Sequence, residues 1–305
     1  MHDLLIIGAG PAGLCAAIYG KRAGLSTMVL EKEPISGGQI VNTYEVDNYP
    51  GLAGISGYDL GEKFREHAEA MGTEFAETEV ECIVIEGNIK KVKTKQGTYE
   101  GKTLIVATGA TNAKLRIPGE EEFLGMGVSY CATCDGAFFK NRTSLVIGGG
   151  DVAVEDAIFL ARNCKKVYLL HRRHELRAAK IAADTLSALT NVEIIWDSIA
   201  DEIKGTNQVE NVRIHNVETG QERTIATDGV FIAVGILPQT SYLKGVVKLD
   251  KYGYVEAGED TLTSVPGVFA AGDIRSKQLR QVVTAIADGA NAVTSVQNYL
   301  LHVTI

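Results

Sequence analysis

The fold is decided by residues 4–31, which read LLIIGAGPAGLCAAIYGKRAGLSTMVLE. The short apolar run over 4–7 is typical of a strand that is buried on both faces. A glycine-rich turn follows, then a helix of small residues to about Ala23 and a second strand over 27–30. This order predicts a βαβ unit.

The turn inside this unit has the pattern of a dinucleotide-binding site. Residues 8–13 fit G-x-G-x-x-G between a strand and a helix, and Glu31 stands at the end of the second strand. Glycines let the backbone approach a pyrophosphate at the helix N-terminus, and the carboxylate can accept hydrogen bonds from ribose hydroxyls. The alternative is a glycine-rich turn without a ligand. The predicted cofactor contacts here are Gly8, Gly10, Pro11, Ala12, Gly13, Glu31 and Lys32.

We do not expect this stretch to cross a membrane or to serve as a signal peptide. Its uncharged part, 4–20, is 17 residues long and follows Asp3 instead of a basic cluster. A bilayer requires roughly 20 apolar residues, and the glycines and Pro11 interrupt the run.

The same pattern returns about 140 residues later, which indicates an internal duplication. A strand over 144–147 leads into three glycines, a helix to about Asn163 and a strand over 167–170. Both halves also contain alternating segments, such as 79–94 and 209–216, that are typical of antiparallel meanders. Each half closes on a buried strand that ends in Gly, at Gly109 and Gly235.

The tail after about Gly245 completes the first domain, because it holds only one more buried strand and a final helix. We expect the apolar face of that helix at Val282, Val283, Ile286, Ala290, Val293 and Val296. The predicted fold class is α/β, with two Rossmann-like dinucleotide-binding domains of the three-layer ββα type, the second inserted in the first. The expected domains are 1–114 with 245–305, which would bind the nucleotide of the first glycine turn, and 115–244, which would bind that of the second. The links near 114–119 and 239–245 are predicted hinges.

The second glycine turn differs from the first in the charge of its surroundings. Where the first unit has an acid, the second has His171, Arg172 and Arg173, with Arg177 close behind. Guanidinium groups pair with a 2′-phosphate that a carboxylate would repel, so this turn predicts NADP(H) over NAD(H). A solvated basic turn is the alternative. The candidate ligands are Gly149, Gly150, Asp151, Val152, Ala153, His171, Arg172, Arg173, Arg177 and Gly235.

Composition narrows the remaining possibilities. The chain of 305 residues has a formal net charge of −8, which argues against nucleic acid or an anionic membrane as the main partner. Five cysteines are too few, and odd in number, for a disulfide framework, which favours a reducing compartment such as the cytoplasm. Two dinucleotide folds in one chain suggest a flavin and a nicotinamide that exchange hydride.

The single C-x-x-C, Cys131 to Cys134, adds a specific chemistry. Two thiols at this spacing can form and open a disulfide with little backbone change, and Asp135 supplies a carboxyl for proton transfer. Structural zinc would need two more ligands, and no metal site is predicted because the other cysteines are far apart in sequence. An inert buried pair is the other alternative. We expect the remaining three, Cys15, Cys82 and Cys164, to pack as core residues.

In these motifs the whole chain resembles the low-molecular-weight bacterial thioredoxin reductases. The resemblance rests on residues 8–13, 37–39, 48–51, 107–109, 131–136, 148–150, 171–177, 267–273 and 280–281. It implies further FAD contacts from Gly38, Gln39, Asn48, Val80, Ala107, Thr108, Gly109, Gly272, Asp273, Arg280, Gln281 and Val282.

The resemblance also implies a mechanism, a partner and an assembly. NADPH would reduce FAD, the reduced flavin would open the disulfide at Cys134, and Cys131 would exchange with oxidised thioredoxin while Asp135 manages the proton. A homodimer is implied as well. The chain departs from the family pattern at Val152, where Ser or Thr is usual, at Gln239, where Asn is common, and at Ala137, which leaves Phe138 and Phe139 for partner docking or for core packing.

Three alternatives for the function remain. A flavoprotein of the same fold could reduce a peroxidase, or it could take electrons from ferredoxin. The third is a flavin-binding redox sensor whose cysteines only report oxidation. An enzyme fed by ferredoxin would not need Arg172 and Arg173.

Overall fold

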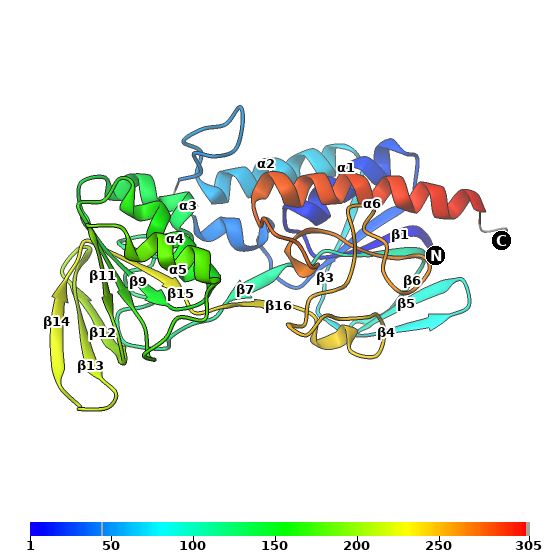
Figure 1. The fold of residues 1–305 in the computed structure, drawn as a ribbon. Coiled ribbons are helices and arrows are strands. Elements are labelled where there is room, and N and C mark those ends of the chain that lie inside the picture. Colours follow the sequence, from blue (N-terminus) through cyan, green and yellow to red (C-terminus); the bar gives the residue numbers. More distant parts are fainter. Residues whose placement is uncertain (44, 303–305) are drawn as a thin grey trace. The chain divides into compact units, whose positions relative to one another are not determined.

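The computed structural model describes residues 1–43 and 45–302 and divides the chain into two compact units (Figure 1). The first consists of residues 1–111 and 237–305, and the second of residues 112–236. The second unit is therefore inserted in the sequence of the first. The predicted links near 114–119 and 239–245 lie just after the two points of division.

The first unit contains most of the N-terminal elements and the end of the chain. Its elements are β1 (His2–Ile7), α1 (Pro11–Arg22), β2 (Thr27–Glu31), η1 (Gly38–Asn42), α2 (Gly57–Ala70), β3 (Glu74–Glu77), β4 (Val80–Glu86), β5 (Ile89–Thr94), β6 (Gly97–Val106), η3 (Ser241–Leu243), β17 (Val268–Ala270), η4 (Gly272–Ile274) and α6 (Val282–His302). The short strands β7 (Ala110–Asn112) and β16 (Ile236–Pro238) pair with each other and contain the two points of division.

A seven-stranded sheet forms the centre of the first unit. Strands β3, β2, β1 and β6 run parallel in that order, and β17 pairs with the second half of β6. The meander of β4 and β5 pairs antiparallel with the first half of β6. The apolar run of β1 explains its central place, because Leu4 and Ile6 enter the core with α1 and α6, whereas Leu5 and Ile7 enter the core with the meander. Helices, parallel strands and meander thus form the three predicted layers.

The second unit repeats this architecture. Its elements are β8 (Val128–Ser129), α3 (Ala132–Asp135), η2 (Gly136–Phe139), β9 (Thr143–Gly148), α4 (Asp151–Ala161), β10 (Lys166–Leu170), α5 (Lys180–Ser187), β11 (Val192–Ile195), β12 (Ser198–Gly205), β13 (Val209–Asn216), β14 (Glu222–Ala226) and β15 (Gly229–Ala233).

The parallel sheet of the second unit has the strand order β11-β10-β9-β15-β8, and β12, β13 and β14 form a separate antiparallel sheet. Val146 and Phe231 lie in one core with helix α4, whereas Leu145 and Val230 lie in the other core with the antiparallel strands. The same alternation therefore places two layers around each parallel sheet, and the α/β fold class is confirmed.

The apolar face expected on α6 is partly wrong. Val293 and Val296 are buried, but Val283 is exposed, and the inner face also contains Ala285, Asp288, Gly289 and Ala292. The cause is the close approach of α6 to α1, which lie side by side in Figure 1. A Cβ at Gly289 would stand 2.3 Å from the carbonyl oxygen of Ala12, so small residues must face inward here.

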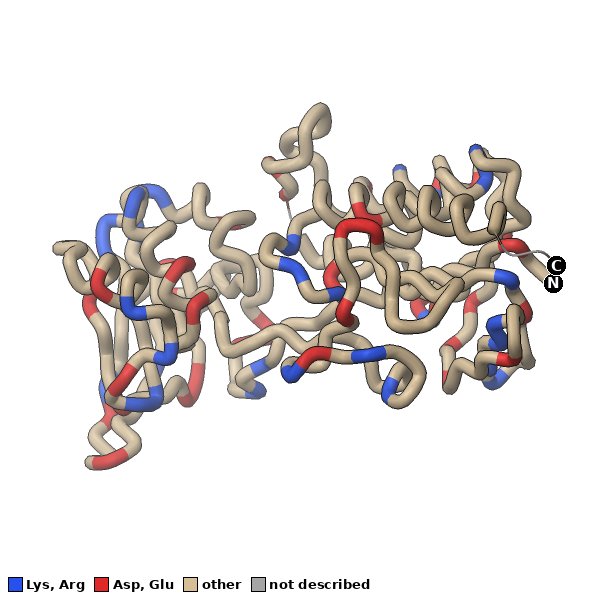
Figure 2. The backbone as a smooth tube through the Cα atoms, turned by 45° about the vertical axis from the view of Figure 1, so that its right-hand side comes forward, with Lys and Arg blue, Asp and Glu red and all other residues tan. Residues whose placement is uncertain are grey.

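Charge and hydropathy of the folded chain add two observations. Lys and Arg are interspersed with Asp and Glu along both units, so the negative balance is spread over the molecule (Figure 2). Among residues 1–43 and 45–302, no helix combines the length and the apolar composition that a bilayer crossing requires.

Candidate functional site

The first glycine turn links β1 to α1, and its three glycines have different surroundings. Gly8 has φ +106°, and a Cβ there would lie 2.5 Å from the carbonyl oxygen of Ala107. A Cβ at Gly13 would lie 1.9 Å from the carbonyl oxygen of Gly8, so these two glycines allow the turn to pack. Gly10 faces open space, and this leaves room for a ligand at the N-terminus of α1.

Glu31 is held at the end of β2, directly beside this turn. Its Oε2 accepts a 2.6 Å hydrogen bond from the backbone N–H of Ala9. Its Oε1 accepts hydrogen bonds from the N–H groups of Lys32 and Glu33, at 2.7 and 3.0 Å. The carboxylate is thus fixed in place, and its remaining lone pairs can accept hydrogen bonds from ribose hydroxyls, as the sequence pattern predicts.

Three further segments meet the same edge of the sheet. Gly37 donates its N–H to the carbonyl of Ala9 at 2.8 Å, and a Cβ at Gly38 would stand 3.3 Å from the Cα of Gly10. After β17, a Cβ at Gly272 would stand 2.9 Å from the Cβ of Ala12. The structure therefore brings η1 and the ends of β6 and β17 to the glycine turn, because the carboxyl ends of parallel strands share one edge.

Thr108, in the turn after β6, belongs to a small hydroxyl network. Its Oγ1 donates to the carbonyl of Gln239 at 3.0 Å and lies 2.9 Å from Oη of Tyr242. Because Thr108 has only one hydroxyl proton, the Tyr242 hydroxyl is the donor of the second bond. Burial raises the pKa of Tyr242, which keeps this donor protonated. Sequence reasoning did not identify Tyr242.

Two buried polar atoms at this edge have no hydrogen-bond partner among the described residues. They are Oδ1 of Asp273 and Nε of Arg280. Burial raises the pKa of Asp273, although Lys277 and Arg280 oppose the shift, and the Lys277 ammonium lies 3.7 Å from Oδ1. A buried acceptor without a donor costs free energy unless a ligand hydroxyl satisfies it. These orphaned atoms and the open space at Gly10 fit the sugar, ribityl and phosphate groups of FAD.

The other predicted FAD contacts are placed as follows. Asn48 donates its side-chain N–H to Oε1 of Gln281 at 2.9 Å, which ties the loop after η1 to the start of α6. Gln39 lies in η1, Val80 begins β4 and Val282 begins α6. Lys32 is exposed directly after β2. Their contacts with FAD remain predictions.

Asp288 is a buried residue at this edge that the sequence did not reveal. It lies on the inner face of α6, where its carboxylate accepts hydrogen bonds from Nε and Nη2 of Arg275, at 2.8 and 2.6 Å. The Lys277 ammonium lies 3.0 Å away, and the N–H of Gly272 donates at 2.9 Å. Burial alone would raise the pKa of Asp288, but the two cations outweigh it and hold the pKa below its usual range. Asp288 thereby fixes the segment that carries Asp273.

In the second glycine turn, between β9 and α4, some glycines again allow close packing and one leaves open space. Gly148 has φ +158°, and a Cβ there would meet the carbonyl oxygen of Ala233 at 2.4 Å and the Cβ of Ala153 at 2.6 Å. A Cβ at Gly149 would overlap the ring of His171, whereas Gly150 faces open space at the N-terminus of α4. The open position corresponds to Gly10 in the first unit.

Residues 171–179, which we call the arginine loop, fold over this second turn. The N–H of Arg177 donates to the carbonyl of Gly149 at 2.7 Å, and the N–H of Ala179 donates to Oδ1 of Asp151 at 2.7 Å. The side chains of Arg172, Arg173 and Arg177 are exposed. The loop thus holds three guanidinium groups beside a nucleotide-type turn, a donor set that fits the 2′-phosphate of NADPH.

His171 and the remaining predicted NADPH contacts occupy different environments. The His171 ring is buried, and its Nε2 lies 3.1 Å from the carbonyl of Glu175. Burial, together with the three nearby arginines, lowers its pKa, so the ring is neutral near pH 7 and supports the turn instead of supplying charge. Val152 is 53% exposed at the start of α4, and Gly235 follows β15 with φ +139°. Their contacts with NADPH remain predictions.

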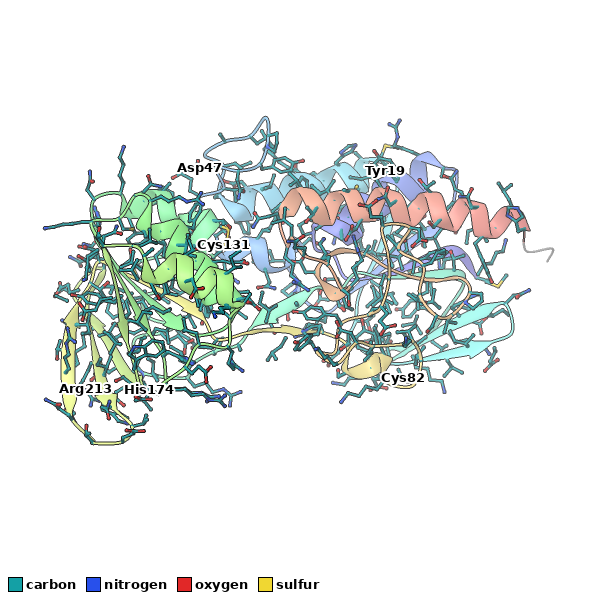
Figure 3. The ribbon with its side chains drawn as sticks, viewed as in Figure 1. Tyr19, Asp47, Cys82, Cys131, His174 and Arg213 are labelled. Atoms are coloured by element: carbon teal, nitrogen blue, oxygen red, sulfur yellow. A yellow bond between two sulfur atoms is a disulfide. The ribbon has the colours of Figure 1, made fainter. Side chains whose placement is uncertain are left out.

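Cys131 and Cys134 form a disulfide, with Cα atoms 5.3 Å apart, at the short helix α3 (Figure 3). The N–H groups of Cys134 and Asp135 both donate to the carbonyl of Cys131, at 3.2 and 3.1 Å. Oγ1 of Thr133 lies 3.4 Å from Sγ of Cys131. One helical turn therefore holds both sulfur atoms in a compact frame.

Asp135 is the carboxyl group of this frame, and Ser129 positions it. The Ser129 hydroxyl donates to Oδ2 of Asp135 at 2.5 Å and accepts from the N–H of Cys131 at 3.0 Å. Burial raises the pKa of Asp135, and the bond from Ser129 opposes the shift. A carboxyl with a raised pKa can hold a proton for a neighbouring thiolate. Sequence reasoning found Asp135 but not Ser129.

The three other cysteines are free, and the prediction that all of them pack as core residues is wrong for one. Cys15 and Cys164 are buried, and burial raises the pKa of Cys15 to about 11. Cys82 is only half-buried, because it alternates with the buried Ile83 along β4 and so faces away from the core.

The two candidate docking residues also differ. Phe139 is buried against Phe231, with ring centroids 5.2 Å apart, and is a core residue. Phe138 is 44% exposed on η2, which directly follows helix α3 with Cys134.

Two dinucleotide folds and a dithiol in one chain define a nucleotide-dependent disulfide oxidoreductase. The chain belongs to the pyridine nucleotide-disulphide oxidoreductase family, whose model matches residues 2–289. It is 44% identical to the thioredoxin reductases of Listeria innocua and Bacillus subtilis over 301 residues, which cover 98% of this chain and 94% and 95% of those proteins. A crystal structure of thioredoxin reductase from Streptococcus pyogenes has 47% sequence identity, covers 99% of each chain and gives a TM-score of 0.94.

Proposed function

We propose that this protein is an NADPH-dependent thioredoxin-disulfide reductase. The observation that carries the proposal is the Cys131–Cys134 disulfide beside the carboxyl of Asp135, in a unit that also holds the arginine loop. The relatives named above are thioredoxin reductases over nearly the whole chain, and thioredoxin reductases of this family use FAD and NADPH.

The two units divide the binding work. In the first, the turn at Gly10, the Glu31 carboxylate and Oδ1 of Asp273, which accepts no hydrogen bond among the described residues, would hold FAD. In the second, the turn at Gly150 and the arginine loop would hold NADPH, with the guanidinium groups on its 2′-phosphate. When bound, FAD would supply the two electrons that open the disulfide, and NADPH would be their source.

The chain's own residues complete the transfer to thioredoxin. The Cys131 thiolate attacks one sulfur of the thioredoxin disulfide and forms a mixed disulfide, which releases a thiolate on thioredoxin. Cys134 then attacks Sγ of Cys131, so that the intramolecular disulfide forms again and the second thioredoxin sulfur leaves. Asp135 holds the proton that neutralises a leaving thiolate. In the sum, NADPH, a proton and oxidised thioredoxin give NADP⁺ and reduced thioredoxin.

The experiment that tests the proposal is a steady-state assay of the purified protein with its cognate thioredoxin, comparing NADPH, NADH and reduced ferredoxin as donors. We expect turnover with NADPH, much less with NADH and none with ferredoxin. Turnover with ferredoxin alone would support the ferredoxin-fed alternative. NADPH turnover with a peroxidase partner but not with thioredoxin would support that acceptor, and absence of turnover with any pair would support a sensor.

Assembly and location extend the proposal on family grounds. We propose that the protein is a homodimer and acts in the cytoplasm, where thioredoxin is reduced. Sedimentation analysis of the purified protein tests the first statement, and fractionation of its native cells tests the second.

A further inference from the structure

His174 is an ionisable group of the arginine loop to which the proposed mechanism gives no role. Its side chain is 86% exposed, and its Nδ1 lies 2.8 Å from Oδ2 of Asp197, in the turn between β11 and β12. The N–H of Asp197 lies 3.4 Å from the carbonyl of Arg173, and His171 exchanges backbone hydrogen bonds with Ile195 and Ser198 at 2.9 and 3.0 Å. The arginine loop is thus attached to the 195–198 turn along its first four residues.

A row of rings connects His174 to the glycine turn. The His171 ring packs on Gly149, where an added Cβ would overlap it. The Trp196 ring centroid lies 6.5 Å from that of His171 and 6.1 Å from that of His174. Trp196 therefore lies near both histidine rings and connects His174 with the ring that packs on Gly149.

The two histidines of the loop have opposite electrostatic surroundings. Burial and the charges of Arg177, Arg173 and Arg172 lower the pKa of His171. The hydrogen bond and the charge of Asp197 raise the pKa of His174, and Glu218 adds to the shift. Asp197 and Glu218 are the charged groups that face His174 from the neighbouring turns; its own loop contributes Arg172, Arg173 and Glu175.

We propose that His174 is a further specificity residue for the 2′-phosphate: when protonated it neutralises Asp197 and clips the arginine loop to the 195–198 turn, so that the preference for NADPH is proton-linked. This inference rests on the proposed NADPH site. His174 acts through the loop and through its charge and is a positioning residue. Figure 3 shows it well apart from Cys131 within the same unit, so the effect concerns nucleotide binding and not the dithiol.

The charge balance gives the direction of the effect. A phosphate of this type bears −1.5 to −2 charges near pH 7. While His174 is protonated, its charge cancels that of Asp197, which then no longer opposes the attraction between the three guanidinium groups and the phosphate. When pH rises through the pKa of His174, the positive charge is lost and Asp197 remains as an uncompensated negative charge beside the loop. This change weakens the preference for a 2′-phosphorylated nucleotide as pH rises and outweighs the smaller, opposite effect of the phosphate's own ionisation, which is nearly complete above pH 7.

Titration calorimetry with 2′,5′-ADP and 5′-AMP measures how the preference for the 2′-phosphate changes with pH and requires no turnover. These two probes differ only by the 2′-phosphate, so the ratio of their Kd values isolates its contribution in the FAD-loaded protein. Between pH 6.5 and 8.5 we expect the preference of the unchanged protein for 2′,5′-ADP to fall by about two- to fourfold. This is the effect on affinity of one charge whose field is screened by solvent and salt.

Two variants separate charge from structure. In His174→Gln, the side chain can still donate to Asp197 but has no charge, so the preference should be low and the pH dependence should match only that of the phosphate itself. In His174→Lys, the charge persists to pH 8.5, so the preference should stay high. The matched control is His215→Gln, because His215 pairs with Asp201 at 2.8 Å on strands β13 and β12, outside the loop, and should behave as the unchanged protein.

The outcomes are distinguishable from failure of the proposed function. If the unchanged protein showed no preference for 2′,5′-ADP at any pH, the NADPH site itself would be wrong. If the preference existed but His174→Gln kept its full pH dependence, only the inference about His174 would be overturned. Equal weakening of both nucleotides in His174→Gln would reveal a merely structural role and would overturn it as well.

Discussion

The hydroxyl of Ser129 donates a 2.5 Å hydrogen bond to Oδ2 of Asp135, one residue after the redox-active Cys134. Ser129 is the last residue of the buried strand β8, so it fixes the carboxyl relative to the rigid sheet of the second unit. A bond donated to the carboxylate favours its charged form, whereas burial favours the neutral form. The balance between the two sets the pH at which Asp135 can release a proton.

Asp135→Asn should slow thioredoxin reduction by about 100-fold, because proton transfer by a positioned group contributes at least that much. Nicotinamide binding and flavin reduction should be unchanged. Ser129→Ala should keep most of the rate but move the pH profile, since loss of the donor raises the pKa of Asp135 further above its ordinary value. Stopped-flow reduction of thioredoxin between pH 5.5 and 9 measures both effects. A downward shift of the profile in Ser129→Ala would contradict this arrangement.

Cys134→Ser should leave FAD bound and reducible by NADPH and should abolish thioredoxin turnover, because a hydroxyl cannot form the disulfide. Flavin absorbance after addition of NADPH reports the first step, and the thioredoxin assay reports the second. The matched control is Cys82→Ser, since Cys82 is a half-buried free cysteine in the other unit and should be dispensable. Normal thioredoxin reduction by Cys134→Ser would refute the dithiol mechanism.

Replacing Arg172 and Arg173 with Ala should raise the KM for NADPH by about 100-fold or more and change the KM for NADH little. Each charged hydrogen bond to the phosphate contributes about 1.5–3 kcal/mol, and NADH lacks the group that receives it. Initial rates with both nucleotides measure the difference. Arg223→Ala is the control, because Arg223 is an exposed arginine of the same unit outside the arginine loop. Equal losses with NADPH and NADH would mean that the phosphate lies elsewhere.

The local sequence was sufficient to predict the central strands of the fold and the turns that follow them. Apolar runs such as 4–7 predicted buried parallel strands, and the glycine patterns predicted the turns that follow β1 and β9. These signals are local, since a strand buried on both faces needs a continuous apolar run and a tight strand-to-helix turn needs glycine. The dithiol was equally visible, because its two cysteines share one helical turn.

Residues whose role depends on contacts between distant segments were not predictable in this way. Ser129 positions Asp135 because β8 ends beside helix α3. Asp288 anchors Gly272 because α6 crosses the end of β17. The inner face of α6 was misplaced for the same reason, since periodicity favoured large apolar residues where the approach to α1 requires Gly289. The position of Cys82 in the interior of a strand predicts a core residue, but a strand has two faces, and the position alone does not say which one is buried.

Removing the carboxylate of Asp288 should destabilise the first unit strongly. In Asp288→Ala, Arg275 would be left as a buried cation without a counter-charge and Lys277 would keep only Asp273, at 3.7 Å; breaking a buried pair in this way typically costs about 3–5 kcal/mol in the free energy of unfolding. The segment that carries Asp273 would also lose its anchor at Gly272, so FAD should be released at lower temperature. Thermal unfolding followed by the fluorescence of released FAD measures this loss.

The pH dependence of that loss distinguishes an ion pair from simple packing. The pKa of Asp288 is lowered in the folded state, so its contribution is complete above the unfolded pKa of about 4 and disappears as pH falls through the folded value. The difference in Tm between the unchanged protein and Asp288→Ala should therefore be large at pH 7 and shrink below pH 4. Asp3→Asn is the matched control: Asp3 pairs with Lys102 at 2.8 Å in a half-buried position, and its loss should cost about 1 kcal/mol or less. A Tm difference for Asp288→Ala that is the same at pH 3 and pH 7 would show that packing, and not charge, accounts for the effect.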